Sequence, residues 1–289
     1  MRRLAILSLL APAIVSAQAP DVMLKLDLRP TLRTELGGGN ALRWYDALGN
    51  HSTVGLYLRL EPGLRALVSE RLQRIPNDGD RNQIDEYYIE DVGIWRVGKQ
   101  YLPFGRGLLI RESVEAARAD TNLLLPGIRL TGAIFDAGMH RQRGVVVRLE
   151  GPIGMSFAVG RNLAISGTSL TVIRNPEASP GARGGYTSML GLDYGRRAGM
   201  WRYQAEWVAL RGGERPEDVE KEVSDVMILV EPNPLRYYGI GWSRAWNERN
   251  DQYRVFAQIP LDRSVWAEPM VRYRGGVLKD FSFTVHVKL

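Results

Sequence analysis

Residues 281–289 read FSFTVHVKL, and they alternate strictly between apolar and polar side chains. The apolar positions are Phe281, Phe283, Val285, Val287 and Leu289. A period of two predicts a β-strand whose two faces meet different surroundings. The pattern continues to the last residue without a polar tail. We therefore expect a strand that is paired along its whole length.

The same alternation recurs along the chain, in segments 22–30, 53–61, 144–150, 200–210, 252–259 and 265–274. The polar rows are rich in Arg and Glu, and the apolar rows carry aromatic residues near the strand ends. This pattern favours an all-β, antiparallel transmembrane β-barrel, in which the apolar face meets lipid and the polar face lines a wet lumen. Closure removes the unpaired strand edges that lipid could not satisfy. A secreted soluble β-sandwich or β-barrel that binds a ligand remains the alternative, because its strands also alternate.

Connections between the expected strands alternate between short and long. Tight connections are expected at 61–63, 91–94, 150–154, 194–199, 231–234 and 260–263, and longer ones at 37–51, 77–84, 105–140, 165–184 and 212–224. Short periplasmic turns and longer external loops are typical of membrane barrels. The spacing predicts about 14 strands, with residues 105–140 forming a long third external loop. If residues 127–136 form a strand of their own the number changes, so 12 to 16 strands stay open.

The N-terminal segment has the layout of a secretory signal peptide. Arg2 and Arg3 precede an apolar stretch over residues 4–15, and small residues follow it at 16–19. We expect residues 1–19 to be removed and residues 20–289 to form one barrel domain in a bacterial outer membrane. Without Arg2 and Arg3, the net charge of +6 falls to +4. That charge is too small to indicate a nucleic-acid partner, and export argues against one.

The stretch VGKQYLPFGRG at 97–107 resembles the general and phosphate-selective porins of bacterial outer membranes. In that family, a strand with a related pattern leads into a third external loop that folds into the pore. The matching residues are Gly98, Lys99, Pro103, Phe104 and Gly105. The later stretch RQRGVVVRLEG at 141–151 is similar to the strand that leaves this loop. The resemblance implies a passive diffusion channel with an inward-folded loop. It does not indicate which substrate the channel would carry.

Charged residues of the expected third loop are candidates for a pore constriction. They are Arg106, Arg111, Glu112, Glu115, Arg118 and Asp120. Separated acidic and basic rows at a constriction create a transverse field that filters solutes by charge and dipole. The alternative is a solvated surface loop with a short helix over residues 111–120.

The polar rows supply candidate lumen-lining residues. Because successive residues of a strand alternate between the two faces (the parity of a position), the inward positions are expected to hold Arg59, Arg96, Arg148, Arg202, Arg254, Arg272, Glu150, Glu206 and Glu268. Many of these are expected to form cross-strand ion pairs that brace the wall. The excess of guanidinium groups favours anions, because Arg stays charged at physiological pH.

Catalysis and metal binding find little support in the sequence. There are three histidines and no cysteine. No G-x-S-x-G or H-E-x-x-H motif is present, and no histidine lies at ligand spacing from carboxylates. We therefore expect no enzyme activity, no cofactor and no metal. The predicted function is passive diffusion of small hydrophilic solutes, with anions favoured, through a porin embedded in outer-membrane lipid. A non-conducting structural or adhesion barrel is the second alternative, and assembly into a homotrimer stays open.

Overall fold

The computed structural model describes residues 21–36, 38–46, 50–73, 83–110, 113–122, 127–163 with a gap at 138–141, 185–213, 221–246 and 250–289. Its strands are β1 (Asp21–Leu28), β2 (Thr31–Glu35), β3 (Asn40–Arg43), β4 (Thr53–Arg59), β5 (Leu64–Arg71), β6 (Ile84–Asp91), β7 (Trp95–Tyr101), β8 (Ser113–Asn122), β9 (Arg129–Ala137), β10 (Gln142–Glu150), β11 (Ile153–Leu163), β12 (Tyr186–Ala198), β13 (Trp201–Arg211), β14 (Lys221–Asn233), β15 (Arg236–Ala245), β16 (Asn250–Asp262), β17 (Val265–Arg274) and β18 (Val277–Lys288). Within these residues, no helix has the length and apolarity to cross a membrane. The predicted signal peptide, residues 1–19, lies outside the described residues.

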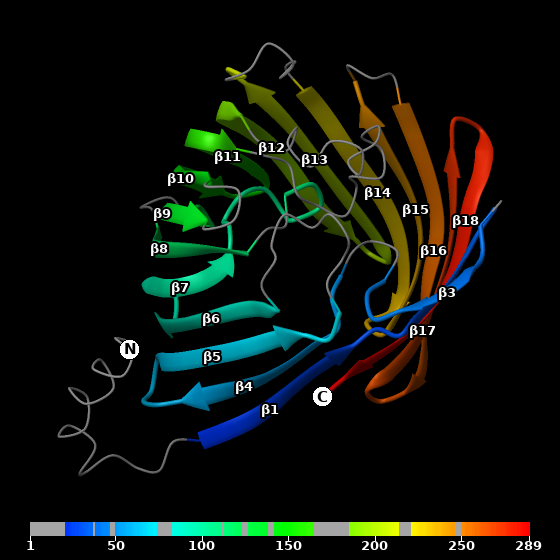
Figure 1. The fold of residues 1–289 in the computed structure, drawn as a ribbon, viewed down its shortest axis with the longest axis horizontal. Helices are drawn as coiled ribbons and strands as arrows, with labels where there is room; N and C mark the ends of the chain where they lie inside the picture. Colours follow the sequence, from blue (N-terminus) through cyan, green and yellow to red (C-terminus); the bar gives the residue numbers. More distant parts are fainter. Residues whose placement is uncertain are drawn as a thin grey trace.

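The strands form one antiparallel sheet that closes on itself (Figure 1). β18 pairs with β1 through Leu28 and Val287, and with β2 through Leu32 and Phe283. Every other neighbouring pair around the barrel, apart from β1 with β4, is consecutive in sequence. The last strand therefore forms antiparallel pairs with β1 and β2, as the pattern of residues 281–289 predicts.

Two of the barrel strands are interrupted. β1 and β2 follow one another along β18, with a break at Arg29 and Pro30. Proline has no N–H to donate to a neighbouring strand, which favours a break at this point. β3 and β4 likewise pair with β2 and β1 respectively. Counting each broken strand once, the eighteen segments form a sixteen-stranded barrel.

The sixteen strands lie within the range that the sequence left open, but the prediction of about 14 was two short. Both additional strands, β8 and β9, lie inside residues 105–140. They pair with each other and with β7 and β10. The prediction of one long loop was therefore wrong, and the alternative of a strand over residues 127–136 is confirmed.

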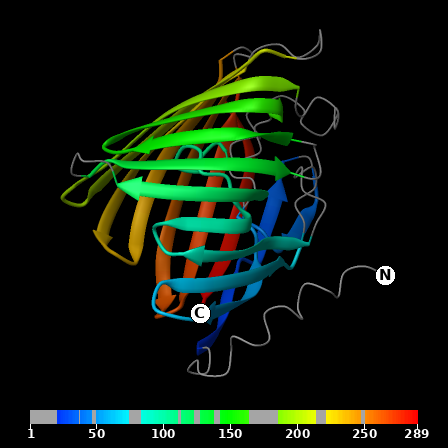
Figure 2. The same cartoon turned by 90° about the vertical axis from the view of Figure 1, so that its left-hand side faces the viewer.

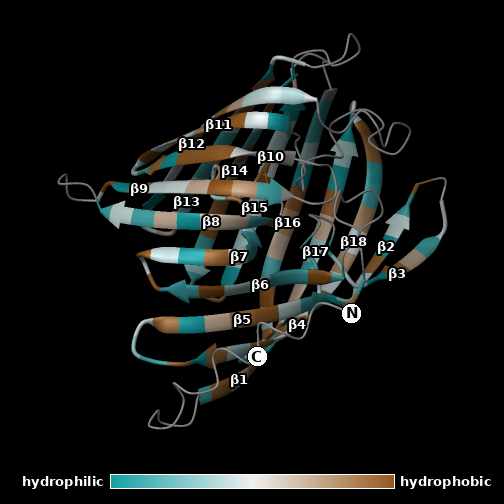
Figure 3. Cartoon of the chain, turned by 60° about the vertical axis from the view of Figure 1, so that its left-hand side comes forward, coloured by the Kyte–Doolittle hydropathy of each residue, from teal (hydrophilic) through white to brown (hydrophobic). Residues whose placement is uncertain are grey.

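The two faces of the wall differ as the alternation predicts. On β18, Phe281 is 44% exposed and Phe283 is 38% exposed, whereas Ser282 and Thr284 are almost fully buried. Apolar and polar positions alternate in the same way along the other strands (Figure 3). Most large apolar side chains of the strands face outward, and most charged side chains face the interior. This is the inverse of a soluble protein and the arrangement of a barrel that crosses a membrane.

The two ends of the barrel carry different connections. The turns β4–β5, β6–β7, β10–β11, β12–β13, β14–β15 and β16–β17 lie at one end, which also holds the C-terminus (Figure 2). These are the six tight turns predicted from the sequence, so the prediction that they all lie at one end of the barrel is confirmed. We refer to this end as the short-turn end and to the opposite one as the long-loop end.

Candidate functional site

Residues 102–110, between β7 and β8, turn into the interior of the barrel and are called the docked segment here (Figure 1). Leu102, Phe104, Leu109 and Ile110 in this segment are buried. They belong to an apolar cluster that includes inward-facing side chains of β8 to β15. The inner wall is thus apolar where the segment lies, and the burial of these side chains holds the segment against the wall.

Backbone hydrogen bonds fix the position of the docked segment. Glu206 on β13 accepts hydrogen bonds at Oε2 from the N–H groups of Arg106 at 3.1 Å and Leu108 at 2.9 Å. The N–H of Gly105 donates to Ser156 Oγ on β11 at 3.0 Å. Gly105 has a φ of 59°, and a Cβ at this position would collide with the Glu206 carboxylate. Only glycine therefore fits this close approach between the segment and the wall.

Asp193 on β12 binds two arginines. Arg106 Nε of the docked segment lies 2.8 Å from Asp193 Oδ1, and Arg148 Nη1 of β10 lies 2.6 Å from Oδ2. The carboxylate is fully buried, so its charge requires such compensation. Arg106 keeps part of its side chain exposed and is the predicted constriction residue that the structure places in the docked segment.

Residues 44–46 and 50–52, between β3 and β4, belong to a second segment, called segment 44–52 here, which places Asp46 and Asn50 in the interior beside Phe256 of β16 and Met270 of β17. Asp46 is buried and accepts hydrogen bonds from Arg29 Nη1 at 2.9 Å and from the N–H of Asn50 at 2.8 Å. The N–H of Arg29 donates to Ser52 Oγ at 2.7 Å. Charged and polar contacts therefore hold this segment.

Arg29 links this segment to β17, which lies two strands away across β18. Its guanidinium lies 2.9 Å from Asp27 and 3.7 Å from Glu268 on β17. Glu268 and Asp27 both contact the ring of His286, at 2.9 Å and 3.1 Å. A cavity of about 50 Å³ with a mixed polar and apolar lining lies beside this network, between Asp46 and Glu268. The volume suffices for bound water.

Most predicted lumen residues face the interior as ion-paired arginines. The pairs are Arg96–Glu90 at 2.7 Å, Arg148–Asp193 at 2.6 Å, Arg202–Glu231 at 3.2 Å, Arg254–Asp225 at 2.6 Å and Arg272–Asp280 at 2.5 Å. Of the acidic residues, Glu206 holds the docked segment and Glu268 contacts His286. Arg59 and Glu150 are exposed near the short-turn end, and Arg59 lies 4.0 Å from Asp21. The expectation that many of these residues brace the wall thus agrees with their contacts.

The predicted constriction residues are separated in the structure. Glu115, Arg118 and Asp120 belong to β8 and not to a loop. Arg118 pairs with Asp120 at 2.9 Å on the inner face, whereas Glu115 is exposed on the outer face and accepts a hydrogen bond from Tyr87. Arg111 and Glu112 lie outside the described residues.

Sequence reasoning missed the carboxylates that hold the arginines. These are Asp193, Asp225 and Asp280, all buried, together with Asp46. Parity contained a signal for Asp193, since it lies between the outward Leu192 and Tyr194 in a strand pattern. Asp46 lies outside any strand, so its role depends on how segment 44–52 folds. Among the described residues, no group of three or more potential ligands could hold a metal ion.

No protein-family model matches the chain, and no curated protein matches it. Solved structures do match it over most of their length. OmpT of Vibrio cholerae with loop L8 deleted is 12% identical, with a TM-score of 0.61 over 94% of this chain and 100% of that one. OmpF of Salmonella typhi in complex with daunomycin is 8% identical, with a TM-score of 0.57 over 93% and 97%.

A third similar structure is the anion-selective porin from Comamonas acidovorans. It is 12% identical, with a TM-score of 0.55, covering 93% of this chain and 99% of that one. At such identities the likeness concerns the fold alone, which agrees with the closed antiparallel sheet described above. The chain therefore has the sixteen-stranded transmembrane β-barrel fold of bacterial outer-membrane porins.

Proposed function

We propose that this protein is an outer-membrane porin that lets small hydrophilic solutes diffuse passively through its interior. The observation that carries the proposal is the inward-facing polar wall narrowed by the docked segment, inside a barrel whose exterior is apolar. Charged side chains facing the interior offer solutes a polar path across the hydrocarbon layer. The protein undergoes no covalent chemistry in this proposal. Export by the N-terminal segment and residence in outer-membrane lipid are part of it.

Arg106 is the residue of the docked segment proposed to act at the constriction. Its guanidinium is held by Asp193 on the wall and stays partly exposed toward the interior. The backbone contacts to Glu206 keep it at a fixed height in the barrel. A positioned cation at the narrowest level acts on every solute that passes.

A modest preference for anions is the finer part of the proposal. Ion pairing compensates most inward arginines, but Arg65 and Arg43 have no carboxylate within ion-pair distance among the described residues. Their guanidinium groups each lie 5.9 Å from a tyrosine ring centroid, over Tyr57 and Tyr45 respectively. Both side chains belong to inward rows of β5 and β3. Guanidinium groups that remain charged attract anions into the interior.

Single-channel recording in planar bilayers tests the function. We expect discrete conductance steps for the folded protein, and a reversal potential that favours chloride under a KCl gradient. Arg65→Gln is expected to shift this potential toward potassium, whereas the outer-face variant Arg244→Gln leaves it unchanged. A clear potassium preference in the unmodified protein contradicts the anion preference and leaves passive diffusion standing.

The second candidate function is a structural barrel without a conducting path. It is favoured by the fact that two separate segments, 44–52 and 102–110, both occupy the interior. The same recording distinguishes the two candidates, because a structural barrel inserts into the bilayer without conductance steps. Assembly into a homotrimer is compatible with either function, and cross-linking in the membrane measures it.

A further inference from the structure

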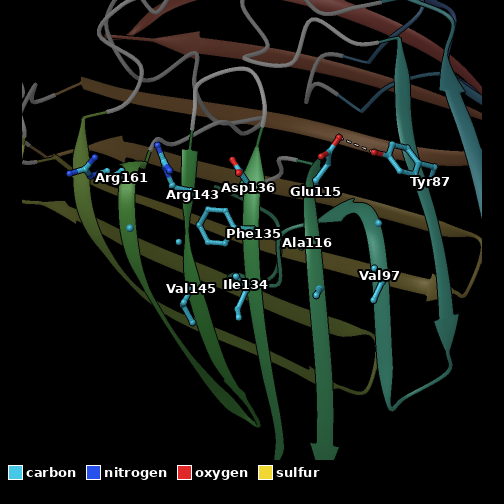
Figure 4. Close-up of a pocket in the computed structure, with 14 residues that line it drawn as sticks. Tyr87, Val97, Glu115, Ala116, Ile134, Phe135, Asp136, Arg143, Val145 and Arg161 are labelled. Carbon is cyan, nitrogen blue, oxygen red and sulfur yellow. Dashed lines mark hydrogen bonds between the residues drawn. The ribbon is translucent and has the colours of Figure 1, made fainter. Parts of the chain in front are cut away.

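A row of polar residues crosses the outer face of β6 to β11 near the long-loop end. The strand register places its members opposite one another: Tyr87, Lys99, Glu115, Asp136, Arg143 and Arg161. Figure 4 shows Arg161, Arg143, Asp136 and Glu115 along the upper edge of the outer face, above Val145 and Ile134. Charged side chains that face away from the barrel interior serve no solute path, so the row requires another explanation.

The charges in this row are unequally compensated. Glu115 accepts a hydrogen bond from the Tyr87 hydroxyl at 2.8 Å, and the buried Lys99 ammonium donates to the Ile84 carbonyl at 2.5 Å. Arg143 and Arg161 are direct cross-strand partners, both exposed, and neither has an ion pair within the described residues. Like charges placed opposite one another destabilise a sheet. An anion between the two guanidinium groups reverses that effect and accepts bidentate hydrogen bonds.

An apolar groove of about 750 Å³ lies directly beside the arginine pair. Its outward-facing lining includes Val97, Ala117, Ile134 and Val145, and glycines of the neighbouring strands deepen it. The groove is open along its outer side, so an occupant lies along the wall and not inside an enclosed cavity. The register places the small side chain of Ala117 between Val97 and Ile134, which leaves space for the groove at this point.

The groove and the arginine pair together have the polarity of an amphiphile. The groove lies among outward-facing apolar side chains, and the arginines lie at its edge toward the long-loop end. Clusters of basic side chains near a membrane surface attract the headgroups of anionic lipids. We propose that the outer face of β7 to β11 binds a phosphate-bearing acyl lipid, with its phosphate between Arg143 and Arg161 and an acyl chain in the groove. This site is independent of the proposed permeation through the interior.

Native mass spectrometry of the folded full-length barrel in detergent tests this proposal, with phosphatidic acid as the probe and phosphatidylcholine as the reference lipid. We expect phosphatidic acid to bind the unmodified protein about 10- to 30-fold more tightly than phosphatidylcholine, given about 1 kcal/mol for each of two arginines. The double variant R143Q/R161Q should abolish this difference. R244Q removes an arginine of β15 that faces Asp251 at 3.6 Å, and it should leave lipid binding unchanged.

Two further variants separate the contributions and guard against a folding defect. D136N removes the carboxylate opposite Arg143 in the register and should increase phosphatidic acid binding, a gain that misfolding does not produce. A117F fills the groove and should weaken lipid binding while both arginines remain. Heat-modifiability on gels verifies that each variant is folded.

Three outcomes overturn the proposal. Equal phosphatidic acid binding by R143Q/R161Q and the unmodified protein removes the role of the arginine pair. Displacement of the lipid by millimolar inorganic phosphate, together with normal binding by A117F, assigns the site to free phosphate. A concentration-dependent doubling of mass that A117F abolishes means that a second copy of the chain covers this face.

Discussion

Residues 102–110 and residues 44–52 both enter the barrel interior, but different forces fix them to the wall. The docked segment buries Phe104 and Leu109 in an apolar cluster and places its N–H groups on Glu206. Segment 44–52 is held through the buried carboxylate of Asp46 and the guanidinium of Arg29. Apolar burial is insensitive to salt, whereas partly exposed charge contacts weaken as ionic strength rises. The comparison shows that one barrel can narrow its interior in two ways, which respond differently to solution conditions.

Gly105→Ala is the substitution expected to have the largest effect, because it loosens the docked segment and leaves the contacts of segment 44–52 intact. A left-handed conformation costs about 1–2 kcal/mol for a residue other than glycine. The added Cβ would also displace the Glu206 carboxylate and break its hydrogen bonds to two partly buried N–H groups, at about 1–3 kcal/mol each. We expect the docked segment to leave the wall, so that single-channel conductance rises and protease cleaves within residues 102–110.

Gly199→Ala is the matched control for this prediction. Gly199 also has a φ of 59°, but a Cβ added to it at the β12–β13 turn would meet no atom within 4 Å. It should show the conformational cost alone and leave conductance unchanged. If G105A and G199A behave alike, the close contact with Glu206 does not hold the segment.

Phe104→Ala should have the next largest effect. Phe104 is 1% exposed, and removal of a buried phenylalanine side chain costs about 3–5 kcal/mol. The free energy of unfolding in urea should fall by this amount, and the loss should persist at high salt. Phe281→Ala on the lipid-facing side removes the same group from outside the barrel. A fall in the free energy of unfolding in F281A that equals that in F104A would show that the effect does not arise at the docked segment.

Asp46→Asn should have the smallest effect. The substitution keeps the shape but removes the charge that binds Arg29 Nη1, a contact worth about 1.5–3 kcal/mol. Arg29 retains Asp27 at 2.9 Å, which limits the loss. We expect a modest increase in conductance whose difference from the unmodified protein shrinks as KCl concentration rises. Asp251→Asn on the outer face is the control, and a salt-independent effect of D46N would contradict the electrostatic origin.

The sequence predicted the outer and inner rows of the strands well and the strand number less well. β18 was predicted from residues 281–289 because its large apolar side chains alternate without exception. β8 was missed because its outward positions hold Glu115, Ala117 and Ala119, which are poor strand formers and carry no large apolar group. A segment rich in Ala, Glu and Arg looks like a helix or loop until its neighbours pair with it.

The candidate site was predicted only in part, for a related reason. Parity identified Arg148 and Arg254 as inward residues, because that property is local to each strand. Their partners lie on other strands: Asp193 is 45 residues from Arg148, and Asp225 is 29 residues from Arg254. The register between strands, which joins these side chains, is not encoded in the alternation of any one of them.

The sequence by itself determined that the strands have one apolar and one charged face, and that the tight turns share one end of the barrel. These properties follow from the period of two and from the spacing of turn residues. Only the tertiary structure decided which carboxylate neutralises each arginine, that two segments enter the interior, and that Arg143 and Arg161 stand opposite one another beside a groove. Each of these depends on closure of the sheet and on its register, which bring together residues that are distant in sequence.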